Sequence, residues 1–111
     1  MRANYKLKYH LKRYIKQELI DYSHNKKLLE ELEASPDNIN SKTILIIKKK
    51  IISIEKVYKN LNENEQAIFN LIFKQGCNQL FAQTYYNITK DMYYNAMNKI
   101  IYLVAKEYDQ I

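Results

Sequence analysis

Glycine and proline each occur only once in this chain of 111 residues, as Gly76 and Pro36. Sheets and turn-rich folds use both residues repeatedly, because tight turns need the backbone conformations that they supply. Hydrophobic residues make up 47% of the chain, a content that excludes a purely disordered segment. The sequence therefore predicts a small all-α protein with few breaks between its helices.

The first 60 residues predict a region of two or three helices. Over residues 4–34, apolar side chains recur every three or four positions and so share one helical face: Leu7, Leu11, Ile15, Leu19, Tyr22, Leu28, Leu29 and Leu32. A kink near residues 21–25 would divide this stretch into two helices, with the hydroxyl of Ser23 capping the second. One bent helix and two separate helices are both compatible with the pattern.

A break and a second long helix follow. The run Ser35-Pro36-Asp37-Asn38 predicts a loop within residues 35–41, because proline disfavours helix in the residue before it and Asp and Asn stabilise turns. The helix expected over residues 43–60 has a heptad-like apolar seam, which Ile46 and Ile52 widen: Ile44, Ile47, Ile51, Ile54, Tyr58 and Leu61. We expect this seam to pack on the first helix as a helical hairpin, with a homodimer as the alternative.

Residues 61–111 predict a helix-turn-helix module of three shorter helices. Asn62 or Asn64 can cap the first helix, and the only glycine lies in the turn at residues 75–78 that follows it. Asn78 can cap the second helix in the same way.

The last helix of the module is expected to run almost to the C-terminus. It follows a turn at residues 87–89, where the hydroxyl of Thr89 can accept a hydrogen bond from a first-turn amide. Its inward side chains follow the helical repeat: Tyr93, Met97, Ile100, Val104 and Tyr108.

Charge is divided unevenly between these two regions. Residues 1–60 hold 14 Lys and Arg against 7 Asp and Glu (net +7), and residues 61–111 hold 4 against 5 (net −1), which together make the +6 of the chain. Six basic residues precede the first acidic one: Arg2, Lys6, Lys8, Lys12, Arg13 and Lys16. This excess of positive charge indicates a polyanionic partner that contacts the N-terminal region.

Several motifs resemble known transcription proteins. Leu61-Asn62-Glu63-Asn64-Glu65-Gln66 is similar to the L-x-x-x-E opening of region 4 of bacterial sigma factors, and Asn87-Ile88-Thr89-Lys90-Asp91-Met92 is similar to its turn and recognition-helix entry. Over nearly its full length the chain also resembles the late-transcription regulators of phages of Gram-positive bacteria, the RinA/ArpU/LtrC-like group. The other segments that carry this resemblance are Glu18-Leu19-Ile20-Asp21-Tyr22 and Ser41-Lys42-Thr43.

The resemblance implies an activator of phage packaging and structural genes that binds double-stranded promoter DNA. It makes Thr89 the cap of the recognition helix, with Asn87 in place of the family's turn glycine. The groove-facing set that it implies is Lys90, Asp91, Tyr94, Asn95, Asn98 and Lys99. These positions lie opposite the expected inward face, and Asn95 can make two hydrogen bonds to adenine while Lys90 or Tyr94 contacts phosphates.

Phosphate contacts supply much of the affinity of DNA-binding proteins, and a module of net charge −1 can make few of them. We therefore expect basic residues of the N-terminal region to contact the DNA backbone: Lys8, Lys12, Arg13, Lys16, Lys48, Lys49 and Lys50. Lys8, Lys12 and Lys16 share one helical edge. A homodimer would double these contacts.

The division of charge also fits a second function. In this alternative the chain is a non-catalytic protein-interaction module, and its weakly charged helix-turn-helix face binds RNA polymerase, a sigma factor or another regulator. The charge division favours this alternative, and the whole-chain resemblance favours DNA binding.

Catalysis and metal binding have no matching residue constellation. Cys77 is the single cysteine, so it cannot form an internal disulfide, and His10 and His24 are expected on the surface. We expect no enzyme activity, no cofactor and no metal. The apolar runs are too short to span a bilayer and no signal-peptide pattern precedes the basic start, so a cytoplasmic protein of the bacterial host cell without a membrane partner is expected.

Overall fold

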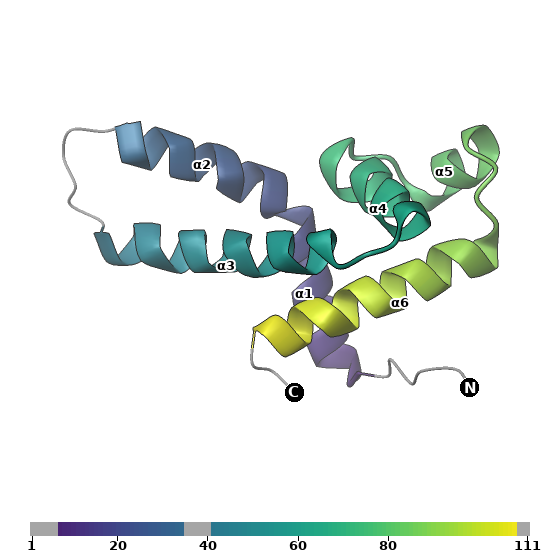
Figure 1. The fold of residues 1–111 in the computed structure, drawn as a ribbon, viewed down its shortest axis with the longest axis horizontal. Helices are drawn as coiled ribbons and strands as arrows, with labels where there is room; N and C mark the ends of the chain where they lie inside the picture. The colour runs from purple at the N-terminus through teal and green to yellow at the C-terminus, as the bar shows by residue number, and fades with distance from the viewer. Residues whose placement is uncertain (1–6, 35–40, 109–111) are drawn as a thin grey trace.

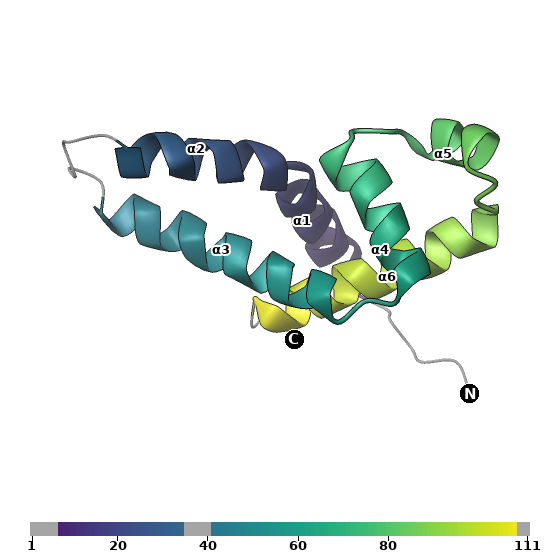
Figure 2. The ribbon, with the colours of Figure 1, turned by 45° about the horizontal axis from the view of Figure 1, so that its top comes forward.

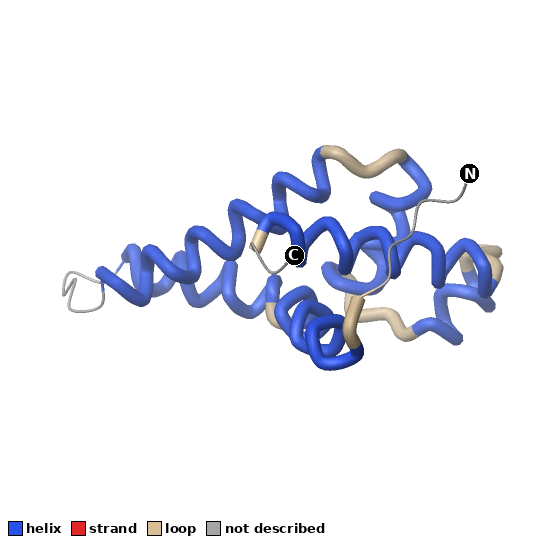
Figure 3. Tube along the Cα trace, turned by 90° about the horizontal axis from the view of Figure 1, so that it is seen from below, coloured by secondary structure: helices blue, strands red, loops and turns tan. Residues whose placement is uncertain are grey.

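A computed structural model describes residues 7–34 and 41–108, and every regular element there is helical (Figure 1, Figure 3). In chain order these elements are α1 (Tyr9–Ile20), α2 (Tyr22–Ala34), α3 (Ser41–Lys59), α4 (Glu63–Phe69), the π-helical turn η1 (Asn70–Lys74), α5 (Gln79–Tyr85) and α6 (Lys90–Glu107). The predicted all-α class is confirmed.

The first apolar stretch forms two helices. Asp21 alone separates α1 from α2, and the two ribbons run in clearly different directions (Figure 1, Figure 2). The predicted cap at Ser23 is wrong, because Ser23 lies inside α2 and its hydroxyl donates to the backbone carbonyl of Phe73 at 3.0 Å. The predicted start at residue 4 lies outside the described residues, and α1 begins at Tyr9.

The helices α2 and α3 run antiparallel and form the predicted hairpin, whose tip extends away from the other helices (Figure 1). The predicted seam packs within the chain, with Ile47, Ile51 and Ile54 of α3 at most 8% exposed. The leucines of α2 are only partly buried against it: Leu28, Leu29 and Leu32. The loop expected within residues 35–41 falls largely outside the described residues, and α3 already begins at Ser41.

The expected widening of the seam by Ile46 and Ile52 is wrong. These side chains are 56% and 57% exposed, and their neighbour Leu45 is 65% exposed. α3 packs on α2 along one side, and on the other side the exposed Leu45, Ile46 and Ile52 are bordered by Glu107 at the end of α6. The apolar residues of α3 therefore divide between an intramolecular seam and an exposed outer face.

The last helix joins the two halves of the chain in one core. α6 packs on both α1 and α3, and its predicted inward side chains are confirmed as buried or partly buried: Tyr93, Met97, Ile100, Val104 and Tyr108. Ile15 and Leu19 of α1 belong to the same apolar cluster, as do Ile54 and Val57 of α3. Residues 1–60 and 61–111 therefore share a hydrophobic core.

Candidate nucleic-acid interface

The turn before α5 depends on the chain's only glycine. Gly76 has a left-handed backbone with φ of 72°, and the amide of Cys77 donates to the carbonyl of Leu71 at 2.9 Å, an arrangement typical of helix C-termini. Asn78 then caps α5, because its side chain accepts a hydrogen bond from the amide of Phe81 at 2.8 Å. The predicted turn and the predicted cap at Asn78 are confirmed.

The turn before α6 orients the candidate recognition helix. Asn87 has φ of 53° and is the one non-glycine residue with positive φ in the described chain, a conformation that asparagine adopts at low cost. Ile88 is buried and anchors the turn to the core. The hydroxyl oxygen of Thr89 accepts a hydrogen bond from the amide of Met92 at 3.1 Å, so the predicted cap is confirmed and α6 begins at Lys90.

The first turns of α6 have an accessible polar side. Lys90, Asp91, Tyr94 and Asn95 are exposed, and Asn98 is half-buried. The ammonium of Lys90 lies 5.9 Å from the centre of the Tyr94 ring. No hydrogen bond to another described residue occupies the amide of Asn95. This side of α6 therefore combines one cation, one anion and uncommitted amide and phenol groups.

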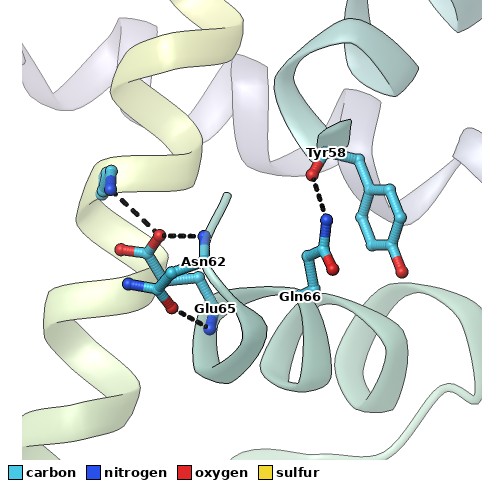
Figure 4. A network of polar contacts seen from close by, with 5 residues as sticks. Tyr58, Asn62, Glu65 and Gln66 are labelled. Atoms are coloured by element: carbon cyan, nitrogen blue, oxygen red, sulfur yellow. Dashed lines mark hydrogen bonds and ion pairs between the residues drawn. The ribbon is translucent and has the colours of Figure 1, made fainter. Parts of the chain in front are cut away.

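Lys99 belongs to a contact between α6 and α4. Its ammonium lies 2.9 Å from a carboxylate oxygen of Glu65, and the two side chains are only 27% and 13% exposed. The same oxygen accepts a hydrogen bond from the backbone amide of Asn62 at 3.0 Å, and the Asn62 side chain accepts one from the Glu65 amide at 2.9 Å. These two reciprocal hydrogen bonds form a capping box at the N-terminus of α4 (Figure 4). Gln66 extends the network by donating to the carbonyl of Tyr58 at 2.9 Å.

This network separates Lys99 from the other residues of the predicted groove-facing set. Glu65 and Lys99 lie 34 positions apart. Helical periodicity relates residues within one helix, so it does not detect a pair that forms only when α4 packs on α6. The network also shows that Asn62, not Asn64, caps α4.

One basic residue of α1, Lys16, lies near the first turn of α6. Ile15 and Leu19 fill the core, whereas the basic side chains of α1 and of the residue before it are exposed: Lys8, Lys12, Arg13 and Lys16. Lys16 and Tyr93 line the same cleft of about 630 Å³ between α1, α2, η1 and α6. Burial raises the pKa of the Tyr93 phenol above its ordinary value. Arg2 and Lys6 lie outside the described residues.

The lysines predicted at positions 48–50 have different surroundings. Lys48 pairs with Glu33 at 3.4 Å, and Lys50 pairs with the nearly buried Glu18 at 2.7 Å. The hydrogen bond to Glu18 raises the pKa of Lys50 despite the opposing effect of burial. Lys49 is exposed and makes no ion pair within the described residues. These lysines lie on α3 of the hairpin, and Lys50 joins α3 to α1 through Glu18.

The helix α5 has an apolar surface that the sequence periodicity does not single out. Leu80, Phe81 and Tyr86 are 73%, 41% and 49% exposed, and the rings of Phe81 and Tyr86 are 6.1 Å apart. No charged residue occurs in residues 75–89, which is the sequence signal for such a surface. Exposed aromatic side chains without charges are typical of the centres of protein interfaces.

The fold defines the chain as a small all-helical protein with a capped helix-turn-helix at one end. Among the described residues, no three His, Cys, Asp or Glu side chains gather in a way that suits a metal ion. The described helices also include none with the length and apolar character needed to cross a bilayer. No family model, curated protein or solved structure matches the chain.

Proposed function

We propose that this chain is a non-catalytic transcription regulator of phage type, an activator of late packaging and structural genes that binds promoter DNA in the bacterial cytoplasm. The observation that carries the proposal is the accessible polar side of α6, which begins at the capped Thr89. Lys16 of α1 lines a cleft together with Tyr93 in the first turn of α6. The resemblance to late-transcription regulators of phages supports the class of target genes.

In this function the first turns of α6 read base edges in the major groove, whose width admits a helix. Asn95 donates to and accepts from an adenine, because its amide matches the donor and acceptor of that base. Lys90 and Tyr94 contact phosphates at the edge of the groove. Asp91 offsets the charge of Lys90, so α6 contributes selectivity more than electrostatic attraction.

The attraction to the phosphates comes from α1. Lys12, Arg13 and Lys16 are exposed, and none of them forms an ion pair with another described residue. Lys16 lines the same cleft as Tyr93 in the first turn of α6, so a duplex that spans this cleft would contact both helices. Lys48, Lys49 and Lys50 are left out of this surface, because they lie on α3 of the hairpin and Lys50 is held by the nearly buried Glu18.

Selection from a random duplex library, followed by binding of the selected and unselected duplexes, tests the function. We expect the wild-type chain to enrich a defined sequence. Asn95→Ala should reduce the preference for that sequence over unselected DNA by about 5- to 150-fold, the range that one two-bond base contact supplies. Asn64→Ala is the matched control, because Asn64 is exposed on α4 and should leave the preference unchanged. An unenriched library, or equal preference in the Asn95→Ala variant, would contradict the proposal.

The apolar surface of α5 favours a second candidate function. In it, the exposed Leu80, Phe81 and Tyr86 bind RNA polymerase, a sigma factor or another regulator, and the chain acts without reading DNA itself. The distinguishing result is a promoter shift that requires added polymerase and is lost in Leu80→Asp but kept in Asn95→Ala. DNA selection by the chain alone would exclude it as the sole function.

A further inference from the structure

The outer face of α3 alternates exposed aliphatic and basic side chains. Leu45, Ile46 and Ile52 are each more than half exposed. Lys48, Lys49 and Lys56 are exposed beside them on the same helix. We call these six residues the α3 outer face. Exposed aliphatic residues that recur at helical spacing are unusual on a surface that only contacts water.

Hollows connect these side chains into a groove. One of about 520 Å³ is lined by Leu45, Ile52 and the three lysines, together with Ser53 and Glu107. A second, of about 230 Å³, lies next to Ile46 and shares Lys49, Ser53 and Glu107 with the first. A third, of about 400 Å³, shares Leu45 and lies towards the tip of the hairpin. From Leu45 to Lys56 the groove follows α3 for about 16 Å, or three helical turns.

The charge of the groove is positive. Its hollows are lined by four lysines and two carboxylates: Lys48, Lys49, Lys50 and Lys56, with Glu33 and Glu107. Lys49 makes no ion pair within the described residues. Lys48 and Lys56 pair with Glu33 and Glu107, but at 3.4 Å and 3.5 Å and with lysine side chains 54% and 64% exposed. Such exposed pairs contribute little, so both lysines can exchange these carboxylates for those of a partner.

We propose that the α3 outer face binds an amphipathic helix of a protein partner, with an apolar stripe flanked by Asp and Glu. The aliphatic side chains accept the stripe, and the lysines on either side pair with the flanking carboxylates. Three turns of groove match three turns of such a helix. The groove meets α6 only at Glu107, the last residue of that helix, so the first turns of α6 stay free to bind DNA at the same time.

A second copy of the chain and DNA fit this surface less well. A symmetric pair of copies would bring two positively charged faces together, and neither copy would offer the acidic flanks that the lysines need. A DNA partner could pair its phosphates with Lys49. It would, however, place the strongly hydrated sugar-phosphate backbone on the aliphatic side chains of Leu45 and Ile52. An amphipathic acidic helix can bury the aliphatic side chains of the face under its apolar stripe and pair its carboxylates with the lysines.

A synthetic helical peptide provides the direct test. The probe has about 20 residues, long enough to form helix, with leucine every third or fourth position and glutamate on both flanks. We expect it to bind the full chain with Kd on the order of 10 μM by fluorescence anisotropy, more weakly at high salt. Two matched peptides, one with lysine for glutamate and one with serine for leucine, should bind at least about tenfold more weakly.

Paired variants of the chain locate the binding. Ile52→Asp should weaken peptide binding at least about tenfold, and Lys49→Glu about three- to tenfold. Ile20→Asp and Lys27→Glu are the controls, because these residues are also exposed but lie on α1 and α2. The controls should bind the peptide as the wild-type chain does.

Three results would overturn the proposal. The first is absence of peptide binding, or equal loss in the control variants. The second is a dimer in sedimentation that Ile52→Asp converts to a monomer, since a second copy would then cover the face. The third is a loss of DNA affinity in Lys49→Glu as large as in variants of α1. Failure of DNA selection by the chain would leave the peptide result unaffected, so the two proposals fail separately.

Discussion

Glu55 of α3 joins the two helices of the hairpin through one carboxylate oxygen. This oxygen accepts from the Tyr22 hydroxyl at 3.0 Å and from the Lys26 ammonium at 3.2 Å. Burial opposes the charged form of Glu55, but the hydrogen bonds from Tyr22 and Lys26 outweigh it and lower the pKa of the carboxyl. Lys26 is held in the charged form by the same contact, which raises its pKa. Charge at a single residue thus affects how firmly α2 packs on α3.

Stability should depend on pH through this residue. A carboxyl whose pKa is lowered by folding stabilises the folded state above its unfolded value of about 4.5, and the effect is lost as pH falls through the folded pKa. Glu55→Gln should therefore lower the free energy of unfolding at pH 7 by less than about 1 kcal/mol, since the ion pair is exposed. The difference should disappear at acidic pH. Urea unfolding at pH 7 and below pH 4 measures it, with Glu31→Gln as the exposed control, and an unchanged difference at both pH values would argue against the contact.

At the scale of the helices, the cap at Thr89 determines whether the first turn of α6 is formed. Thr89→Ala removes the acceptor for the Met92 amide and should lower the free energy of unfolding by about 1 kcal/mol. The same change should speed hydrogen exchange at the Met92 amide, because the first turn then frays. Thr89→Ser keeps the hydroxyl and should behave as the wild-type chain. Equal exchange in all three proteins would show that the cap does not hold this turn.

The capping residues of α5 and α6 could be predicted from the sequence, whereas contacts between distant helices could not. The caps at Asn78 and Thr89 were predictable because each depends on residues within three positions. Ser23 has the same cap chemistry, but its hydroxyl contacts Phe73, 50 positions away. The buried position of Glu18 beside Lys50 likewise depends on how α1 packs on α3.

Periodicity has the same limit. Ile51 and Ile52 are equally apolar, yet only Ile51 faces α2 in the seam while Ile52 is exposed. For the candidate site, the accessible side of α6 followed from the helical repeat, because Tyr93 and Met97 fix which side is buried. The pairing of Lys99 with Glu65 and the apolar surface of α5 required the three-dimensional structure.

Across the whole molecule, which measures 49 × 32 × 23 Å, the hairpin tip and the helix-turn-helix occupy opposite ends of the long axis (Figure 1). α1 and α6 pack on each other and share the core, so the basic residues of α1 are held in a constant position relative to α6. A duplex on α6 would extend towards α1, while the α3 outer face would stay accessible. This arrangement separates the proposed DNA contacts at the start of α6 from the proposed peptide contact on α3.

The salt dependence of DNA binding tests the shared role of α1 and α6 most directly. Reversing Lys12, Arg13 and Lys16 together to Glu should weaken binding to the selected duplex, and the slope of log K against log salt should fall by about 2 to 3, since each lost phosphate contact removes about 0.9. Reversing Lys27, Lys42 and Lys59 gives the same change in net charge at exposed positions on the hairpin. We predict a much smaller change of slope for this second variant. Equal slopes for the two variants would contradict a DNA surface made by α1 and α6.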